Sequence, residues 1–366
     1  MNKINFKNNL FNTHIFLLIL LNNSFLSQII IISFFILICF YFGTLDFNIF
    51  KLFFFFILSI TLTINFEIIE VKNLLRLFQI ILAFTFFPLK IKRDIININI
   101  LKIVTFLIFI FTILDIFNSD IFFYIRDNFY PISENPWERA FDRNSDYQIN
   151  HRYGSIFYNP NLLGQTIVIL NIFYLIYFVN KKINKNDLFF IILNILCIII
   201  SGGRTAFIVL CLTSLPFFFK IKNFKNYLIF SSFFLLPIVI YYFSDSRLFN
   251  IVNSASMSDK WGILFNFIGK LDINTILNIF FGWFKTDIQF DNDIGNIFYF
   301  LGLFGLFCLF CFYFYQMFSI NRRYIYLYSF IMISYGATLI INFKFLILTI
   351  YIFSLINSLK KEITKI

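Results

Sequence analysis

Long apolar runs alternate with short polar segments along most of the chain. The runs are close in length to the ~20 residues that a helix needs to cross a bilayer, and they predict twelve membrane-spanning helices. The predicted spans are 9–21, 25–43, 47–65, 69–88, 98–117, 160–179, 187–201, 204–219, 226–243, 294–315, 323–340 and 343–358. Because 9–21 and 187–201 are short, the first two runs or the pair around Gly202 could instead be broken or re-entrant.

Two longer polar segments, 118–159 and 244–293, interrupt this alternation. They divide the chain into 1–117 with about five helices, a central group of helices in 160–243 and a C-terminal group in 294–366. Loops of this size are usually functional or disordered rather than simple connectors. The expected fold is therefore an all-α polytopic membrane protein with about twelve transmembrane helices and two long loops.

The two long loops contain all three tryptophans of the chain, Trp137, Trp261 and Trp283. Tryptophan can stack on sugar rings, but it is also common at membrane interfaces, and the interfacial role is the preferred interpretation. Two stretches of the second loop, 258–270 and 274–284, have helical apolar spacing with polar faces. Such amphipathic segments are predicted to lie flat on the membrane surface.

Composition supports the membrane class and narrows the range of partners. Hydrophobic residues make up 60% of the 366 residues and charged residues only 13%, which excludes an ordinary soluble domain. The net charge of +11 comes from short basic clusters between apolar runs, so it indicates membrane topology rather than nucleic-acid binding. All five cysteines lie inside apolar runs without metal-ligand spacing to a histidine, so we expect buried small hydrophobic side chains, no metal site and no cofactor.

The positions of lysine and arginine predict the orientation of the chain in the membrane. With the N-terminus inside, the twelve crossings place more than half of the 30 basic residues in short cytoplasmic loops. These basic residues are Lys3, Lys7, Lys51, Lys90, Lys92, Arg93, Lys181, Lys182, Lys185, Lys220, Lys222, Lys225, Arg322, Arg323, Lys360, Lys361 and Lys365. Both termini are then cytoplasmic, and the two long loops lie on the outer face together with the segment 201–204.

Two arginine-containing motifs fall on this predicted outer face. The first runs from His151 through Arg152 to Gly164 and leads directly into an apolar run. Its Asn159-Pro160 step is expected to start a helix, because proline biases the preceding residue away from helical geometry and fits the first helical turn. The second motif is 201–206, Ser-Gly-Gly-Arg-Thr-Ala, whose two glycines suit a bend or a backbone that comes close to an anion.

These motifs resemble those of the O-antigen ligase and polymerase superfamily. The first similarity is in residues 152–161, Arg-Tyr-Gly-Ser-Ile-Phe-Tyr-Asn-Pro-Asn, which resemble the family's string of arginine, glycine, aromatic residues and Asn-Pro-Asn. The second is in residues 201–206, which resemble the family's short Ser/Gly-Arg turn between two spans. A third similarity is Asp291-Asn292 followed, after nine residues, by Gly302-Leu-Phe-Gly305. The corresponding ligase pattern begins with histidine, so the aspartate favours a Wzy-type polymerase. The two glycines of this third motif are by themselves expected to be helix-packing positions.

The resemblance, which covers roughly residues 120–320, implies a GT-C-type glycosyltransferase in the bacterial inner membrane. It implies that a polyprenyl-diphosphate-linked oligosaccharide is polymerised into O-antigen or exopolysaccharide on the outer face, with a flippase and a chain-length regulator as possible partners. Two alternatives stay open: an O-antigen ligase that transfers finished glycan to lipid A core or protein, and a polysaccharide flippase or other transporter. A transporter is less favoured, because no internal repeat is evident and Lys102, Asp115 and Lys344 lie near span ends.

Arginines are the expected ligands of the diphosphate. Transfer from a lipid diphosphate requires that the growing charge of the leaving group be neutralised by a metal or by fixed cations. A guanidinium offers a planar fork of donors that matches phosphate oxygens. We therefore predict that Arg152 and Arg204 bind the diphosphate, with Arg247 as a weaker third candidate. Alternatively, Arg204 caps a helix or pairs with an acidic loop residue.

A carboxylate is the expected general base, because the attacking acceptor hydroxyl must lose its proton. Asp291 occupies the position of the ligase histidine in the third motif and is the first candidate, followed by Asp293. His151 is a third candidate, because the neighbouring Arg152 disfavours its protonation and leaves a neutral base. The aspartates could also serve only to keep the loop solvated.

Overall fold

The structure, a computed structural model, describes residues 3–21, 25–43, 49–65, 71–117, 119–129, 153–157, 159–218, 276–283, 293–318, 322–335 and 343–363. All regular elements in these residues are helices, which confirms the predicted all-α class. Within this described part of the chain, three helices are long and apolar enough to cross a membrane, Ile98–Ile116, Pro160–Phe178 and Ile294–Phe318. The total number of crossings stays a prediction.

Within the described residues, each predicted span overlaps a helix. The largest differences occur in two places. The predicted span 9–21 belongs to a helix that begins earlier, α1 (Lys3–Leu20), and the predicted span 323–340 is the 3-10 helix η5 (Arg322–Tyr335). One predicted span, 226–243, lies outside the described residues.

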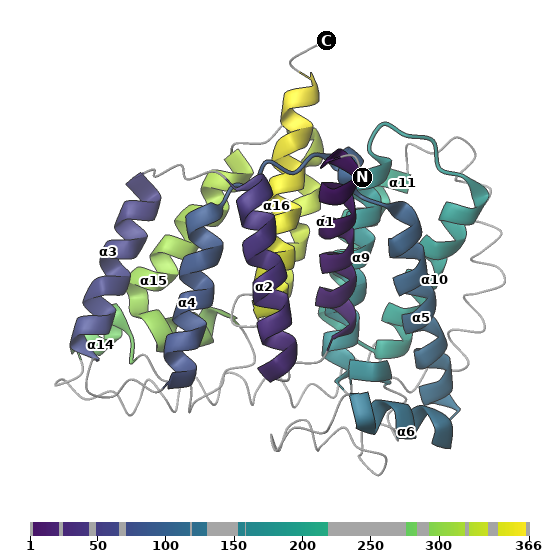
Figure 1. The fold of residues 1–366 in the computed structure, drawn as a ribbon, viewed down its shortest axis with the longest axis horizontal. Coiled ribbons are helices and arrows are strands. Elements are labelled where there is room, and N and C mark those ends of the chain that lie inside the picture. The colour runs from purple at the N-terminus through teal and green to yellow at the C-terminus, as the bar shows by residue number, and fades with distance from the viewer. Residues whose placement is uncertain are drawn as a thin grey trace. The chain divides into compact units, whose positions relative to one another are not determined.

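The chain divides into two compact units. Figure 1 labels their α-helices. Unit 1 comprises residues 1–18, 28–95 and 254–366, and unit 2 comprises residues 19–27 and 96–253. Unit 1 contains most of α1 and of α2 (Phe25–Phe42), then α3 (Ile49–Ile64), α4 (Val71–Phe86), η2 (Arg93–Ile95), α14 (Ile276–Phe281), α15 (Asp293–Phe318), η5 and α16 (Phe343–Ile363). Unit 2 contains α5 (Ile98–Ile116), α6 (Asp120–Phe129), η3 (Ser155–Phe157), α9 (Pro160–Phe178), α10 (Lys185–Ser201) and α11 (Arg204–Phe218).

An aromatic core holds unit 1 together around α16. Tyr351 and Phe353 of α16 are fully buried, and the ring of Phe353 makes a T-shaped contact with Phe312 of α15, with the ring centroids 5.5 Å apart. The Tyr351 hydroxyl forms a hydrogen bond of 2.6 Å with Nδ1 of His14, which is fully buried in α1. This bond pairs one buried ring nitrogen of His14 with the buried hydroxyl of Tyr351 in an apolar interior.

A glycine interrupts α15. Gly302 has φ 71° and ψ −169°, a backbone geometry that favours glycine, and it kinks a segment predicted as one uninterrupted span. The segment that follows α14 reaches this kink, where the N–H of Trp283 donates to Tyr299 O at 2.8 Å. A Cβ built on Gly302 would lie 2.3 Å from Phe280 O. Gly302 therefore permits the close approach of another helix, as expected for a small residue. The approach occurs at a kink of α15, and the approaching element is the end of the short helix α14.

Helix α9 forms the centre of unit 2. It packs against α5, α10 and α11, and every residue from Leu163 to Ile176 is buried. A predominantly apolar helix that is buried on all sides is expected in the interior of a helical bundle. The Asn159 side chain caps α9 by accepting the N–H of Asn161 at 2.8 Å, and Pro160 occupies the first turn, as the sequence predicts.

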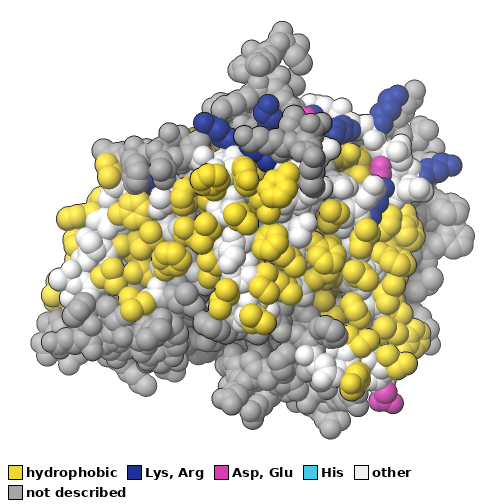
Figure 2. Space-filling view, in the orientation of Figure 1, with side chains coloured by type: hydrophobic (Ala, Val, Ile, Leu, Met, Phe, Trp, Pro, Cys, Tyr) yellow, Lys and Arg dark blue, Asp and Glu magenta, His cyan; other side chains and the backbone are white. Residues whose placement is uncertain are grey.

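The helices of unit 2 alternate in direction, so the unit has two distinct ends. At one, the lysine end, Lys102 near the start of α5 forms an ion pair of 2.5 Å with Asp187 near the start of α10. At the other, the loop end, α5 and α10 finish and α9 and α11 begin. Figure 2 shows Lys and Arg side chains at the edge where α5 begins and a band of hydrophobic side chains below them. Which end faces outward stays a prediction.

Candidate functional site

The structure describes two of the six predicted site residues. Arg204 is the first residue of α11, at the loop end of unit 2, and its side chain is half-buried. Asp293 is the first residue of α15 in unit 1. The other predicted residues, His151, Arg152, Arg247 and Asp291, lie outside the described residues. The geometry of the site is therefore built from Arg204 and the segments that adjoin it.

The two arginine motifs pack directly against each other. Gly164, the last residue of the first motif, lies near the start of α9 and faces the second motif. A Cβ built on Gly164 would lie 2.9 Å from Ala206 Cβ and 3.2 Å from Ser201 Oγ. Ordinary contacts between carbon atoms are about 3.5–4.0 Å, so a residue larger than glycine does not fit here unless a neighbour moves. The close approach brings the beginning of α9 and the beginning of α11 together.

A tight turn places Arg204 at the start of its helix. α10 ends at Gly202, whose φ of 62° is the left-handed geometry that glycine adopts most readily. Ser201 Oγ accepts the Gly203 N–H at 3.2 Å, and Gly203 O accepts the Phe207 N–H at 2.9 Å as α11 begins. The two glycines therefore form a bend between two helices, one of the roles that the sequence suggested for them.

The loop end of unit 2 has groups that can attract an anion, alongside the opposing C-termini of α5 and α10 and the carboxylate of Asp115. α9 and α11 both begin there. The N-terminus of a helix presents backbone N–H groups and carries a partial positive charge. Arg204 adds a full positive charge at the first residue of α11. These groups together can attract a negatively charged group such as a phosphate.

A buried ion pair that the sequence interpretation missed lies at the same end of unit 2. Asp115, near the C-terminus of α5, accepts the N–H of Ser155 at 2.9 Å through Oδ2, and its Oδ1 lies 3.9 Å from Arg126 Nη1. From the sequence, Asp115 counted only as a charge near a span end. Ser155 is 40 residues away along the chain, so no local pattern indicates the contact. The one available signal was a carboxylate at the end of an otherwise apolar run.

Tyr153 adjoins this pair and is half-buried. Burial raises the pKa of the Tyr153 hydroxyl, and the negative charge of Asp115 raises it further. The phenol therefore stays protonated at neutral pH. It can donate a hydrogen bond there, but it is not a candidate for the general base.

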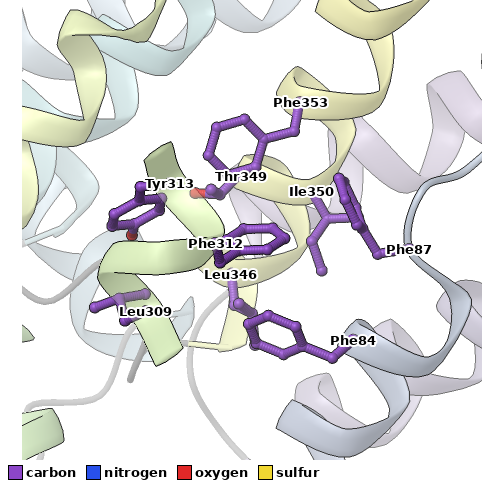
Figure 3. A pocket seen from close by; sticks show the side chains of 9 residues that line it. All are labelled: Phe84, Phe87, Leu309, Phe312, Tyr313, Leu346, Thr349, Ile350 and Phe353. Carbon is purple, nitrogen blue, oxygen red and sulfur yellow. The ribbon is translucent and has the colours of Figure 1, made fainter. Parts of the chain in front are cut away.

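A small cavity in unit 1 is apolar. Its lining residues are Phe84, Phe87, Leu309, Phe312, Tyr313, Leu346, Thr349, Ile350 and Phe353. Figure 3 shows that they come from α4, the coil directly after it, α15 and α16, and that aromatic rings occupy most of the wall. None of these lining residues is charged, so the cavity offers no cation for a diphosphate.

The fold and the site define the class of this chain. It is an all-α protein with helices able to span a membrane, and two sequence motifs meet at one end of one of its helical units. Among the residues that the structure describes, no group of three or more His, Cys, Asp or Glu side chains could hold a metal ion. Comparison with known proteins gives no match to a family model, a curated protein or a solved structure. A functional assignment therefore depends on the motifs and their geometry.

Proposed function

We propose that this chain is a membrane glycosyltransferase that polymerises oligosaccharide repeat units, carried by polyprenyl diphosphate, into O-antigen or exopolysaccharide. In this proposal the chain crosses the bacterial inner membrane twelve times, with both termini in the cytoplasm. The loop end of unit 2 then faces outward. Lipid-linked substrate reaches it from the outer leaflet of the membrane.

The contact between the two motifs at Gly164 and Ala206 is the observation that carries the proposal. The resemblance to the superfamily includes both motifs beside the third one at Asp291, and a site shared by the first two requires them to adjoin. Their contact puts the N-termini of α9 and α11, together with Arg204, at one end of the bundle. This is the arrangement that recognition of a diphosphate at a membrane surface needs.

The proposed reaction is a glycosyl transfer. The hydroxyl oxygen of the acceptor sugar bonds to the anomeric carbon of the donor, and the bond from that carbon to the diphosphate oxygen breaks. The diphosphate leaves with the electron pair, and the hydroxyl proton passes to the base. Arg152 and Arg204 neutralise the leaving group, with Arg247 as the weaker third ligand. Asp291 is the proposed base, with Asp293 and then His151 as the alternatives.

The test is a gel of surface polysaccharide from a strain that lacks the protein, restored with the wild-type chain or a variant at equal protein level. Without the protein, we expect a single repeat unit on its acceptor. Arg204→Ala is expected to leave mainly short products, because loss of one preorganised donor costs roughly 10²–10³ in rate. Arg204→Lys is expected to restore only part of the polymer length, since an ammonium lacks the planar fork of donors.

Lys182→Ala is the matched control, because Lys182 is an exposed basic residue at the lysine end of unit 2. This variant should produce wild-type chain lengths. Full-length polymer from Arg204→Ala would refute the role of Arg204 as a diphosphate ligand. The strain without the protein also separates the alternatives. If it has bare acceptor and accumulates long lipid-linked polymer, the protein is a ligase. If its polysaccharide profile is unchanged, the protein has another function such as transport.

A further inference from the structure

The buried pair of Asp115 and Arg126 takes no part in the proposed transfer, yet it lies where charge is costly. Asp115 is 3% exposed and Arg126 2% exposed. The dipole of α5 opposes a carboxylate in its last turn, and a buried charge costs free energy unless it is paired. Neither effect favours an aspartate at this position. The reason for its presence therefore has to lie in the groups that it binds.

Asp115 binds the turn that leads into α9. Its carboxylate accepts the N–H of Ser155 at 2.9 Å and also bonds to the backbone of Gly154. Ser155 has a φ of 54°, a left-handed geometry that residues with a side chain rarely adopt. The N–H of Phe157 closes the turn by donating to Gly154 O at 3.1 Å. Such a geometry persists only where its surroundings hold it, and the carboxylate supplies charge-assisted bonds that do so.

Arg126 holds the carboxylate from the side of α6. Its Nη1 is 3.9 Å from Asp115 Oδ1, and its guanidinium carbon lies 4.6 Å from the ring centroid of Phe123 and 5.6 Å from that of Phe122. The two rings form a buried cluster with Ile156 of the turn. α6 is thereby attached to the end of α5 and to the turn by both charge and apolar contact.

We propose that Asp115, supported by Arg126, is a positioning residue for the loop end of unit 2, an inference that rests on the proposed function. By holding Gly154 and Ser155, the carboxylate sets the direction in which the chain enters α9. It thereby sets the position of the α9 N-terminus against the turn that carries Arg204. Asp115 acts through this helix and does not itself touch the substrate.

The first measurement is amide hydrogen exchange of the full chain in lipid nanodiscs, which reports the anchor independently of catalysis. Asp115→Ala is expected to raise the exchange rate at Gly154 and Ser155 about tenfold or more, because the amides lose a charged acceptor. Asp115→Asn should have a smaller effect, since its amide oxygen can still accept one N–H. Asp120→Asn is the matched control, because it removes an exposed carboxylate from the start of α6. If the wild type and the three variants exchange these amides at equal rates, Asp115 does not anchor the turn and the proposal is overturned.

The second measurement is the polysaccharide gel with the variants Asp115→Ala and Arg204→Ala, singly and combined. Asp115→Ala is expected to shorten the polymer, and Asp115→Asn to restore part of its length. The double variant should be no worse than Arg204→Ala alone, because residues that act through one another are not additive. A role in stability alone predicts lower protein level and an additive defect.

The two measurements together separate this inference from the function on which it rests. The positioning role is overturned if Asp115→Ala raises the amide exchange but still makes full-length polymer, while Arg204→Ala shortens the polymer. An additive defect in the double variant also overturns it. If both single variants make full-length polymer, the proposed function of Arg204 is overturned. Raised amide exchange in Asp115→Ala would then show that Asp115 anchors the turn and does nothing further.

Discussion

Gly164 makes the contact that joins the two motifs, and replacing it tests that geometry directly. In Gly164→Ala, the new Cβ would lie 2.9 Å from Ala206 Cβ. Ordinary carbon contacts are about 3.5–4.0 Å, so α9 and α11 would have to separate locally by about 0.6 Å or more. α9 cannot yield easily, because every residue from Leu163 to Ile176 is buried in a densely packed interior.

Two opposing effects set the size of the change. Overpacking an interior costs about 1–3 kcal/mol, whereas alanine in place of glycine stabilises a helix by about 0.5–1 kcal/mol. The difference between these ranges predicts that Gly164→Ala destabilises the protein by up to about 2.5 kcal/mol. The variant should also shorten the polymer, since it moves the N-terminus of α9 away from Arg204.

The assay is thermal unfolding of the protein in detergent micelles, at a fixed scan rate because the unfolding of large proteins is often irreversible. A loss of about 1 kcal/mol corresponds to a fall in Tm of about 2–4 °C for units of this size. Ala206→Gly is the matched variant, because it removes the methyl group that the new Cβ meets. Gly164→Ala combined with Ala206→Gly should unfold no lower than Ala206→Gly alone. If the two losses simply add, the motifs do not touch at this point and the reasoning is refuted.

Two further predictions concern the lysine end of unit 2 and the kink of α15. Asp187→Asn is expected to lower stability by about 1–2 kcal/mol in the same thermal assay, because it breaks the ion pair with Lys102. The loss is moderate because the Lys102 side chain is 20% exposed, so water partly screens the pair. An unchanged Tm would mean that this ion pair contributes nothing. Gly302→Ala is expected to detach the end of α14 from α15, because its Cβ would lie 2.3 Å from Phe280 O. The amide exchange of Trp283 should then rise, and continued protection would contradict the close approach.

Much of the helical arrangement could be predicted because its causes are local. A chain inside a bilayer has to satisfy its backbone groups within each segment, so long apolar runs become helices. The start of α9 follows from the Asn159-Pro160 step, and the end of α10 follows from Gly202, which adopts the left-handed geometry of a C-terminal cap. The kink at Gly302 escaped prediction, because a glycine in an apolar run is compatible with both a straight and a broken helix.

The candidate site could be predicted only in part. Arg204 was identified from its motif, and the structure places it at a helix N-terminus. The contact of Gly164 with Ala206 depends on how α9 and α11 pack, and this packing leaves no trace in either segment alone. Asp115 escaped notice for a similar reason, since the charge and the turn that it binds are 40 residues apart along the chain.

The sequence by itself determined the helical class of this protein and the position of most described helices, and it suggested arginines as ligands of a diphosphate. These properties depend on hydrophobicity and turn geometry over one or two helical turns, which are encoded locally. Only the tertiary structure decided which motifs adjoin and which buried charges pair, as Asp115 does with Arg126 and Ser155. Such pairs are selected by the packing of whole helices, because a buried charge is stable only where another part of the chain supplies its partner.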